Sequence, residues 1–281
     1  MSTYPRSVAA RHVEPLAVVL GTDEIASAVA VRLHQSGHGV VMCHDPDRPV
    51  IRRGMAFHDV LWGEMVTLDG VAGVPLECAI EMRLPATLGS AVRVGSLGLV
   101  DLLPVGPFAV LVDARTGLSS NVPDLRNLAA LTVGIGPFFR SGINCDVAVE
   151  SGRTAPGASA TGNRGRRAGA RASEARDPEH LRIRAEVPGR WHTSHVPGVR
   201  VYRGMVVGHL GPVPVTAPRD GILRGVARDG VEIPEGAEVV EIDVRNRWRV
   251  RWTGIDDTAA EIAEAVERTL TLHFSAAATA H

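Results

Sequence analysis

The chain has 281 residues, enough for two modest domains that each bury a core. Hydrophobic residues make up 45% and aromatic residues 4%, so we expect cores of Val, Leu, Ile and Ala. The formal net charge of −1 excludes a global field that would draw the chain to nucleic acid or to an anionic membrane. All 30 basic residues are arginine, which excludes a Schiff-base lysine, a phosphate-loop lysine and a lysine carrying biotin or lipoate.

Cysteine usage favours a reducing compartment. Cys43, Cys78 and Cys145 are odd in number and widely spaced, and the N-terminal segment lacks the apolar stretch of a secretory signal. No run approaches the roughly 20 apolar residues that span a bilayer. We therefore expect a cytoplasmic protein.

The first elements in chain order form a strand–helix–strand unit. Residues 16–20 are a short apolar run typical of a buried strand, and residues 25–35 carry apolar side chains at helical spacing. Gly37 ends the helix, and residues 40–43 form the next strand. A unit of this length predicts two parallel strands joined by a right-handed crossover.

Residues 1–150 as a whole predict an open α/β sheet. Further strands are expected at 64–68, 108–113 and 131–135. Residues 123–130 are interpreted either as a short helix with proline at its first position or as a loop.

The composition changes abruptly after residue 150. Residues 151–182 consist mostly of Gly, Ala, Ser and Arg and predict a flexible linker, because they offer little apolar surface to bury. Contact of its arginines with an acidic partner or RNA is the less favoured alternative.

Short strands separated by dense turn signals then predict a small β sandwich or barrel over residues 183–252. The expected strands are 213–216, 221–226, 230–233, 239–242 and 248–252. The last part, residues 253–281, contains an amphipathic helix over 257–272, capped by Asp257 or Thr258.

The turn after the first strand resembles a dinucleotide-binding turn with one glycine changed. Gly21 occupies the first glycine position and Ala26 is an acceptable third, but Asp23 stands at the second. A carboxylate there competes with a phosphate for the helix N-terminus. Asp23 and Glu24 also suit the first turn of a helix, so a purely structural role is the alternative.

Other residues with possible binding roles follow the next strands. Asp45 could accept a ribose hydroxyl or cap the turn before Pro46. Arg52 and Arg53 could anchor a phosphate or carboxylate, or form surface ion pairs. The histidines before residue 60 lack the spacing of zinc ligands on one element, and the His192–His195 pair has ligand-like spacing but lies in an expected loop without a nearby Cys or further His, so we predict no metal.

The strand ends suggest a shared crevice. Asp113 and Arg115 end one strand, and Gly134 and Gly136 follow the next. Open α/β sheets bind ligands at this carboxyl edge. We expect Gly21, Arg52, Asp113, Arg115 and Gly136 to face one crevice there.

Several motifs follow one another in a characteristic order along the chain. They are Arg32-Leu-His34 with Ser36-Gly37, Pro49-Val-Ile-Arg-Arg53 with Ala56-Phe57, Val112-Asp-Ala-Arg115, Gly134-Ile-Gly-Pro137 with Asp146-Val147 and Glu150, Ala217-Pro-Arg-Asp-Gly-Ile-Leu-Arg224, and Glu241-Ile-Asp-Val-Arg245. In this order they resemble one family, the YqeB-type accessory proteins of selenium-dependent molybdenum hydroxylases. The resemblance covers most of residues 16–150 and 200–270.

The resemblance implies an α/β, Rossmann-like N-terminal domain joined to a barrel-sandwich hybrid domain of the biotinyl or lipoyl kind and a C-terminal helix. It also implies a role in maturing a molybdenum hydroxylase such as xanthine dehydrogenase, with a hydroxylase subunit as partner and a nucleotide or molybdopterin-type ligand. The family's second glycine is Asp23 here, whereas Glu24 keeps the family's acid. The family's Arg-Gly-His segment after Glu150 is missing, so its histidine is not transferred.

Three hypotheses follow. The chain is an accessory factor that binds cofactor or enzyme through the crevice, an NAD(P)-dependent oxidoreductase, or a degenerate scaffold without catalysis. The oxidoreductase needs an acid–base residue, for which the candidates are His44 and His58.

Overall fold

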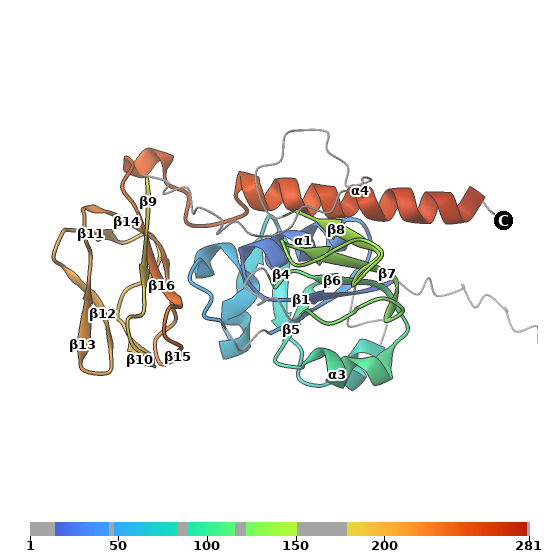
Figure 1. Cartoon of the computed structure of the whole chain (residues 1–281), viewed down its shortest axis with the longest axis horizontal. Helices are drawn as coiled ribbons and strands as arrows, with labels where there is room; N and C mark the ends of the chain where they lie inside the picture. The colour runs from blue at the N-terminus through green and yellow to red at the C-terminus, as the bar shows by residue number, and fades with distance from the viewer. Residues whose placement is uncertain (1–14, 45–47, 84–88, 116–121, 151–178, 280–281) are drawn as a thin grey trace, which may run out of the picture.

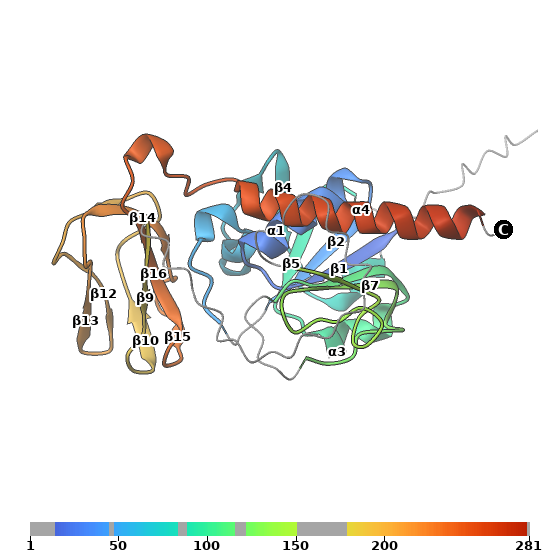
Figure 2. The same cartoon turned by 45° about the horizontal axis from the view of Figure 1, so that its top comes forward.

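The structure, a computed structural model, describes residues 15–44, 48–83, 89–115, 122–150 and 179–279. Residues 15–150 within these ranges, called the α/β part below, contain one eight-stranded sheet. Residues 179–252, called the β part, contain two four-stranded sheets. The two parts lie side by side, and a long C-terminal helix returns to the α/β part (Figures 1 and 2).

The eight-stranded sheet has the order β3-β4-β5-β2-β1-β6-β7-β8. Its strands are β1 (Leu16–Leu20), β2 (Gly39–Cys43), β3 (Val66–Leu68), β4 (Val71–Pro75), β5 (Val92–Gly95), β6 (Phe108–Asp113), β7 (Ala129–Ile135) and β8 (Val147–Val149). All neighbours are parallel except the β3–β4 hairpin. The predicted strand–helix–strand unit is confirmed, since β1 and β2 pair in parallel and flank α1 (Glu24–Gln35). The other strands predicted in this part are also present, whereas β4, β5 and β8 had no clear sequence signal.

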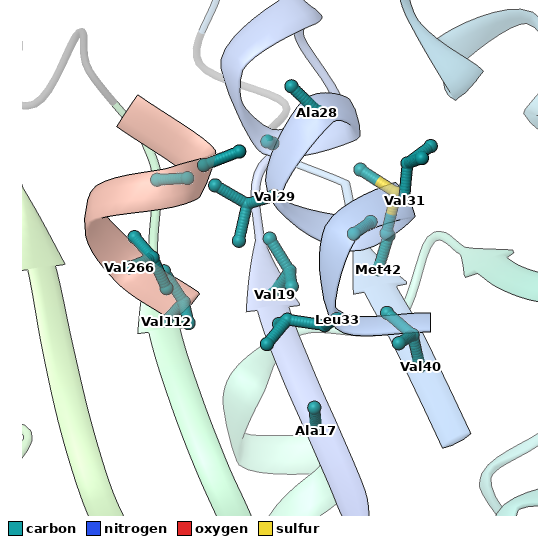
Figure 3. Packing of buried hydrophobic residues seen from close by; sticks show 14 of the residues in the cluster. Ala17, Val19, Ala28, Val29, Val31, Leu33, Val40, Met42, Val112 and Val266 are labelled. Atoms are coloured by element: carbon teal, nitrogen blue, oxygen red, sulfur yellow. The ribbon is translucent and has the colours of Figure 1, made fainter. Parts of the chain in front are cut away.

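Two helices cover one face of this sheet. Helix α4 (Asp257–Thr279) packs beside α1 and contacts β7 and β8. Figure 3 shows Val29 and Leu33 of α1 and Val266 of α4 over Val19 of β1 and Val112 of β6. The predicted apolar stripe of α4 is confirmed, because its members enter this core. They are Ala259, Ile262, Ala263, Val266 and Leu270.

The opposite face is covered mainly by short elements and loops. They include α3 (Leu99–Leu102) and the 3₁₀ helices η3 (Ala79–Arg83) and η4 (Leu103–Val105). Of the predicted segment 123–130, residues 123–128 form a loop with a turn and no helix, whereas residues 129 and 130 belong to β7. Leu125 anchors the loop in the core. On the β2–β3 connection lie η1 (Arg53–Met55) and η2 (Phe57–Trp62).

The β part consists of a sheet of order β13-β12-β10-β15 and a sheet of order β11-β14-β16-β9. Its strands are β9 (His180–Arg184), β10 (Gly189–His192), β11 (Arg200–Val201), β12 (Val206–Leu210), β13 (Val213–Thr216), β14 (Gly221–Val226), β15 (Glu232–Ile233) and β16 (Glu238–Asp243). Trp191 is fully buried in the core of this part.

Three predictions near the ends of these elements are wrong. The strand expected at 248–252 is replaced by a 3₁₀ helix, η5 (Arg247–Arg249), followed by irregular chain, since only Val250 of that stretch enters the interior. Residues 180–182, assigned to the linker, belong to β9, and residues 151–178 lie outside the described residues. The cap of α4 is Asp256, whose Oδ1 accepts a hydrogen bond from the Ala259 N–H at 2.8 Å.

The segment before η1 joins the two parts directly. Ile51 belongs to the core of the β part, and its carbonyl accepts a hydrogen bond from the Val226 N–H at 2.8 Å. Gly225 permits this approach, since an added Cβ would lie 3.1 Å from the Ile51 carbonyl. Gly54 similarly permits close approach of the Trp252 carbonyl. Within the described residues, no helix combines the length and apolarity needed to cross a membrane.

Candidate functional site at the carboxyl edge of the large sheet

The turn after β1 has the conformation that its glycine predicts. Gly21 has φ +110°, and its N–H donates to the Cys43 carbonyl at 2.9 Å. A Cβ at this position would lie 3.3 Å from the Ala26 Cβ and 3.4 Å from the Ala114 carbonyl. Both the backbone conformation and the space therefore favour glycine at the junction of β1, α1 and the end of β6.

Asp23 occupies the helix N-terminus that a dinucleotide phosphate would use. It is the N-cap of α1, and its Oδ1 accepts the Ala26 N–H at 2.9 Å. The carboxylate thus places its own negative charge where the helix field would stabilise a bound phosphate. The structural role of Asp23 weighs against the NAD(P) hypothesis.

Arg52 is the centre of an ion-pair network that joins the two parts. Its guanidinium donates to Glu241 through Nε at 2.6 Å and Nη2 at 3.0 Å, and to Glu24 through Nη1 at 3.0 Å. Burial acts to lower the pKa of Arg52, but the nearby charges of Glu24, Glu241 and Asp256 outweigh it and raise the pKa. Arg52 is therefore a permanently charged tie between the α1 N-terminus and β16.

Arg224 completes this network from β14. It donates to Glu241 at 3.1 Å and to Asp256, the cap of α4, at 2.8 Å. Burial acts to raise the pKa of Glu241, but the hydrogen bond and charge of Arg52, with the charge of Arg224, lower it overall. We call Glu24, Arg52, Arg224, Glu241 and Asp256 the interface network.

Arg53 belongs to a second cluster at the same interface. It donates to Asp59 at 2.7 Å and to the Val226 carbonyl at 3.1 Å. Arg228 of the β part reaches Asp59 at 3.1 Å and Glu64 at 2.5 Å, and it lies 4.9 Å above the Trp62 ring. Arg53 and Arg228 thus hold η2 against the β part.

The histidines nominated as acid–base candidates meet beside this cluster. His58 is buried, and its Nδ1 lies 2.8 Å from the Thr22 hydroxyl. Its ring centroid is 5.3 Å from that of His44 and 4.8 Å from that of Trp62. Burial first, then the charges of His44, Arg53 and Arg228, lowers the pKa of His58 to about 3. His58 is therefore neutral at physiological pH.

Asp113 and Arg115 pair with each other at the end of β6. The Arg115 side chain donates to Asp113 at 2.9 and 2.6 Å, and the Asp113 carboxylate is fully buried. Burial raises the pKa of the neighbouring Cys43 thiol to about 12, although the charge of Arg115 acts to lower it. The thiol is protonated at neutral pH and is not an activated nucleophile.

The two predicted glycines after β7 have different roles. An added Cβ at Gly134 would collide with the Phe139 ring, so Gly134 serves packing. Gly136 has φ +125°, and its N–H donates to the Val149 carbonyl at 3.0 Å, so it shapes the turn at the strand end.

The residues predicted to face one crevice form two separate groups in the structure. Strand pairing aligns Leu20 with Asp113 and Asp113 with Gly134, which places the Gly21, Asp113 and Gly136 region along one edge. Arg52 and Arg53 are instead engaged by the interface with the β part. Glu24 joins Arg52 there, and Asp45 lies outside the described residues.

The sequence prediction missed the partners of these arginines. Arg224 and Glu241 lie within the two motifs of the β part that carry the family resemblance. Their place in these motifs was the sequence signal that could have marked them as site residues. Asp256 has the signature of a helix cap directly before an amphipathic run. Trp62 and Arg228 had no signal, because they meet only through tertiary packing.

The described residues contain no group of three or more His, Cys, Asp and Glu side chains arranged to hold a metal. In the His192–His195 pair, His192 lies 3.4 Å from an Asp229 oxygen, and His195 lies 3.3 Å from the Val206 carbonyl.

Comparison with known proteins finds a sequence relative. The chain is 26% identical over 265 residues to the uncharacterized protein YqeB of Escherichia coli K12. The match covers 89% of this chain but 46% of YqeB, so the chain spans about half the length of that relative. No family model matches. The crystal structure of an aspartoacylase family protein from Mesorhizobium loti covers 83% of this chain and 86% of its own at 10% identity, with a TM-score of only 0.23.

Proposed function

Because the chain is a divergent member of the YqeB-type family, we propose that it is an accessory or maturation factor of a molybdenum hydroxylase resembling xanthine dehydrogenase. In this role it binds the hydroxylase, its cofactor or both at the carboxyl edge of the large sheet. A cytoplasmic location and a hydroxylase subunit as partner are parts of the same proposal.

The observation that carries a binding role is the chemistry of this edge. His58 is held neutral with a pKa of about 3, and the Cys43 thiol is held protonated with a pKa of about 12. A general acid or base works best with a pKa near the working pH, and neither group meets that condition. The Asp113 carboxylate at this edge is bound by Arg115. Such an edge suits recognition better than catalysis.

The arrangement of strands supports the architecture in this proposal. The order β5-β2-β1-β6-β7-β8 corresponds to the 3-2-1-4-5-6 order of doubly wound dinucleotide folds, with β4 and β3 added at one side. The order reverses between β1 and β6, beside Gly21 and Asp113, where such sheets bind ligands. We assign the α/β part to a Rossmann-like domain and the β part to a barrel-sandwich hybrid that lacks the lysine of a covalent carrier.

Two measurements in the organism that encodes the chain test this function. The tagged full chain is purified under mild conditions and examined for a bound hydroxylase subunit and for molybdopterin by native mass spectrometry. Hydroxylase activity is measured in a strain lacking the chain and after re-expression of the wild type. We expect co-purification and a loss of activity that re-expression restores. An empty preparation together with unchanged activity would refute the proposal.

A degenerate scaffold is the second candidate, and one observation favours it. Arg52 and Arg53, the residues best suited to bind an anion, are occupied by carboxylates of the chain itself. A scaffold predicts hydroxylase binding without any small ligand in the native mass spectrum. The NAD(P) alternative predicts heat on calorimetric titration with NADH, and the Asp23→Gly variant tests whether that carboxylate alone prevents binding.

A further inference from the structure

One apolar side chain of the β part points fully into solvent. Trp248 lies in the middle of η5 and is 93% exposed. It stands between Arg247 and Arg249, both of which are also exposed. Exposed tryptophan is costly in water because its large indole surface is apolar, so this position calls for an explanation.

The turn that carries Trp248 is fixed on both sides. The Arg249 N–H donates to the Asn246 carbonyl at 2.8 Å, and the Val250 N–H donates to the Arg247 carbonyl at 3.2 Å. Val250 is buried, and the Arg247 guanidinium lies 5.5 Å above the Trp252 ring. The indole is therefore presented by an anchored turn, which lowers the entropy lost when a partner covers it.

The arginines around η5 either pair with a carboxylate or lack one. Arg245 pairs with Asp243 at 2.6 Å, and Arg251 lies 3.4 Å from Asp257. Across the part of the chain that the structure describes, neither Arg247 nor Arg249 has a carboxylate partner. The exposed tryptophan is thus flanked by two positive charges that no ion pair among the described residues neutralises.

We infer that Arg247, Trp248 and Arg249, called the RWR turn, form a second docking surface for the molybdenum hydroxylase, in the β part and apart from the carboxyl edge of the large sheet. The inference rests on the proposed function and goes beyond it by adding this contact. The partner surface that fits is an apolar pocket for the indole with carboxylates at its rim. Trp and Arg are the side chains most enriched among residues that dominate binding energy, and charge complementarity speeds the encounter.

The experiment measures binding of the purified hydroxylase of the same organism to the full chain by biolayer interferometry. The variants are Trp248→Ala, the double variant Arg247→Glu/Arg249→Glu, and the conservative double variant Arg247→Lys/Arg249→Lys. The matched control is Val100→Ala, since Val100 is 78% exposed on α3 in the other part. Circular dichroism and thermal unfolding verify that each variant is folded.

We expect Trp248→Ala to weaken binding about 30-fold or more, as truncation of a dominant interface residue does. The charge reversal should slow association about tenfold at low salt, whereas the lysine variant should keep most of the association rate. The control should bind within about twofold of the wild type.

The outcomes separate the docking surface from the function on which it rests. If the wild type binds the hydroxylase and Trp248→Ala binds it equally well, the RWR turn is not the docking surface, while the accessory role stands. No hydroxylase binding by the wild type overturns the docking surface, whereas the accessory role is refuted separately, by an empty preparation together with unchanged hydroxylase activity in the strain lacking the chain. Self-association of the wild type that Trp248→Ala abolishes, without hydroxylase binding, assigns the turn to a second copy of the chain and likewise overturns the proposal.

Discussion

The arginines of this chain occupy two opposite environments in the β part and at its interface. In the interface network, Arg224 is buried and Arg52 is largely buried, and both share the carboxylate of Glu241. In the RWR turn, Arg247 and Arg249 stand exposed beside an exposed indole. The residue type is the same, and only the neighbours differ.

This difference teaches which arginines can contact a second molecule. A buried guanidinium that already holds two carboxylates must break those bonds before it binds anything else, and breaking a buried ion pair is costly. An exposed guanidinium without a carboxylate loses only its water and its mobility. We therefore assign the buried arginines to holding the two parts together and the exposed ones to recognition.

The largest expected loss of stability comes from a substitution in the interface network. Glu241→Ala removes the carboxylate shared by Arg52 and Arg224, leaving both charges undercompensated, and should lower the free energy of unfolding by about 3–5 kcal/mol. Urea denaturation measures it. The matched control on the same strand is Glu238→Ala, whose partners Arg182 and Arg184 are half exposed, with a loss of at most about 1 kcal/mol. Equal losses for the two variants would contradict a structural role for the network.

The second prediction concerns the pH dependence contributed by His58, beside Arg53 and Arg228. Its pKa falls from 6.5 to about 3 on folding, so between these values the unfolded chain binds the proton and the folded chain does not. This contribution to stability is present above pH 6.5 and is lost as the pH falls, by about 1.4 kcal/mol per pH unit. His58→Gln should remove that slope in urea denaturation at pH 7.5, 6 and 5. Parallel curves for the wild type and the variant would show that His58 protonates freely in the folded state.

A third prediction tests the packing between the α/β part and the β part with a substitution that changes no charge. Gly54→Ala places a methyl group against the Trp252 carbonyl. A backbone carbonyl cannot move aside as easily as the end of a flexible side chain, so the collision lowers the stability. The loss should be about 1–3 kcal/mol. Gly189→Ala is the control, because its added Cβ meets only ordinary contacts near 3.9 Å and should change stability by no more than about 1 kcal/mol. A neutral Gly54→Ala would mean that the two parts can separate at little cost.

A fourth, smaller effect is expected at the cap of α1. Asp23→Ala removes the acceptor for the Ala26 N–H and should cost about 1 kcal/mol, whereas Asp23→Gly should cost only a few tenths. Thermal unfolding distinguishes the two. An Asp23→Gly variant as unstable as Asp23→Ala would show that the side chain does more than cap the helix.

The smallest expected effect lies on the exposed side of the comparison. The double variant Arg247→Ala/Arg249→Ala should lower the free energy of unfolding by no more than about 0.5–1 kcal/mol, since neither side chain holds an ion pair within the described residues and Arg247 makes only an exposed cation–π contact with Trp252. Urea denaturation under the conditions used for Glu241→Ala gives the direct comparison. A loss above about 2 kcal/mol would place these arginines in the fold and remove the reason for assigning them to a partner.

Local patterns predicted only part of the regular elements, since β4, β5, β8 and the strands β9 to β12 were not expected. The helix at 25–35 and the strand at 108–113 carry their period in their own residues, so burial on one or both faces is visible in the sequence. The stretch 248–252 misled because Trp248, Val250 and Trp252 alternate as in a strand. Only packing shows that Val250 is buried while Trp248 is exposed.

The candidate site was less predictable, because its decisive contacts join distant residues. The sequence by itself determined the Gly21 turn and the first-turn acids of α1, since a turn and a helix cap depend on residues within a few positions of each other. The tertiary structure alone decided that Arg52 meets Glu241, which lies 189 positions away. A guanidinium suits a phosphate and a carboxylate equally well, so the folded chain determines which one it holds.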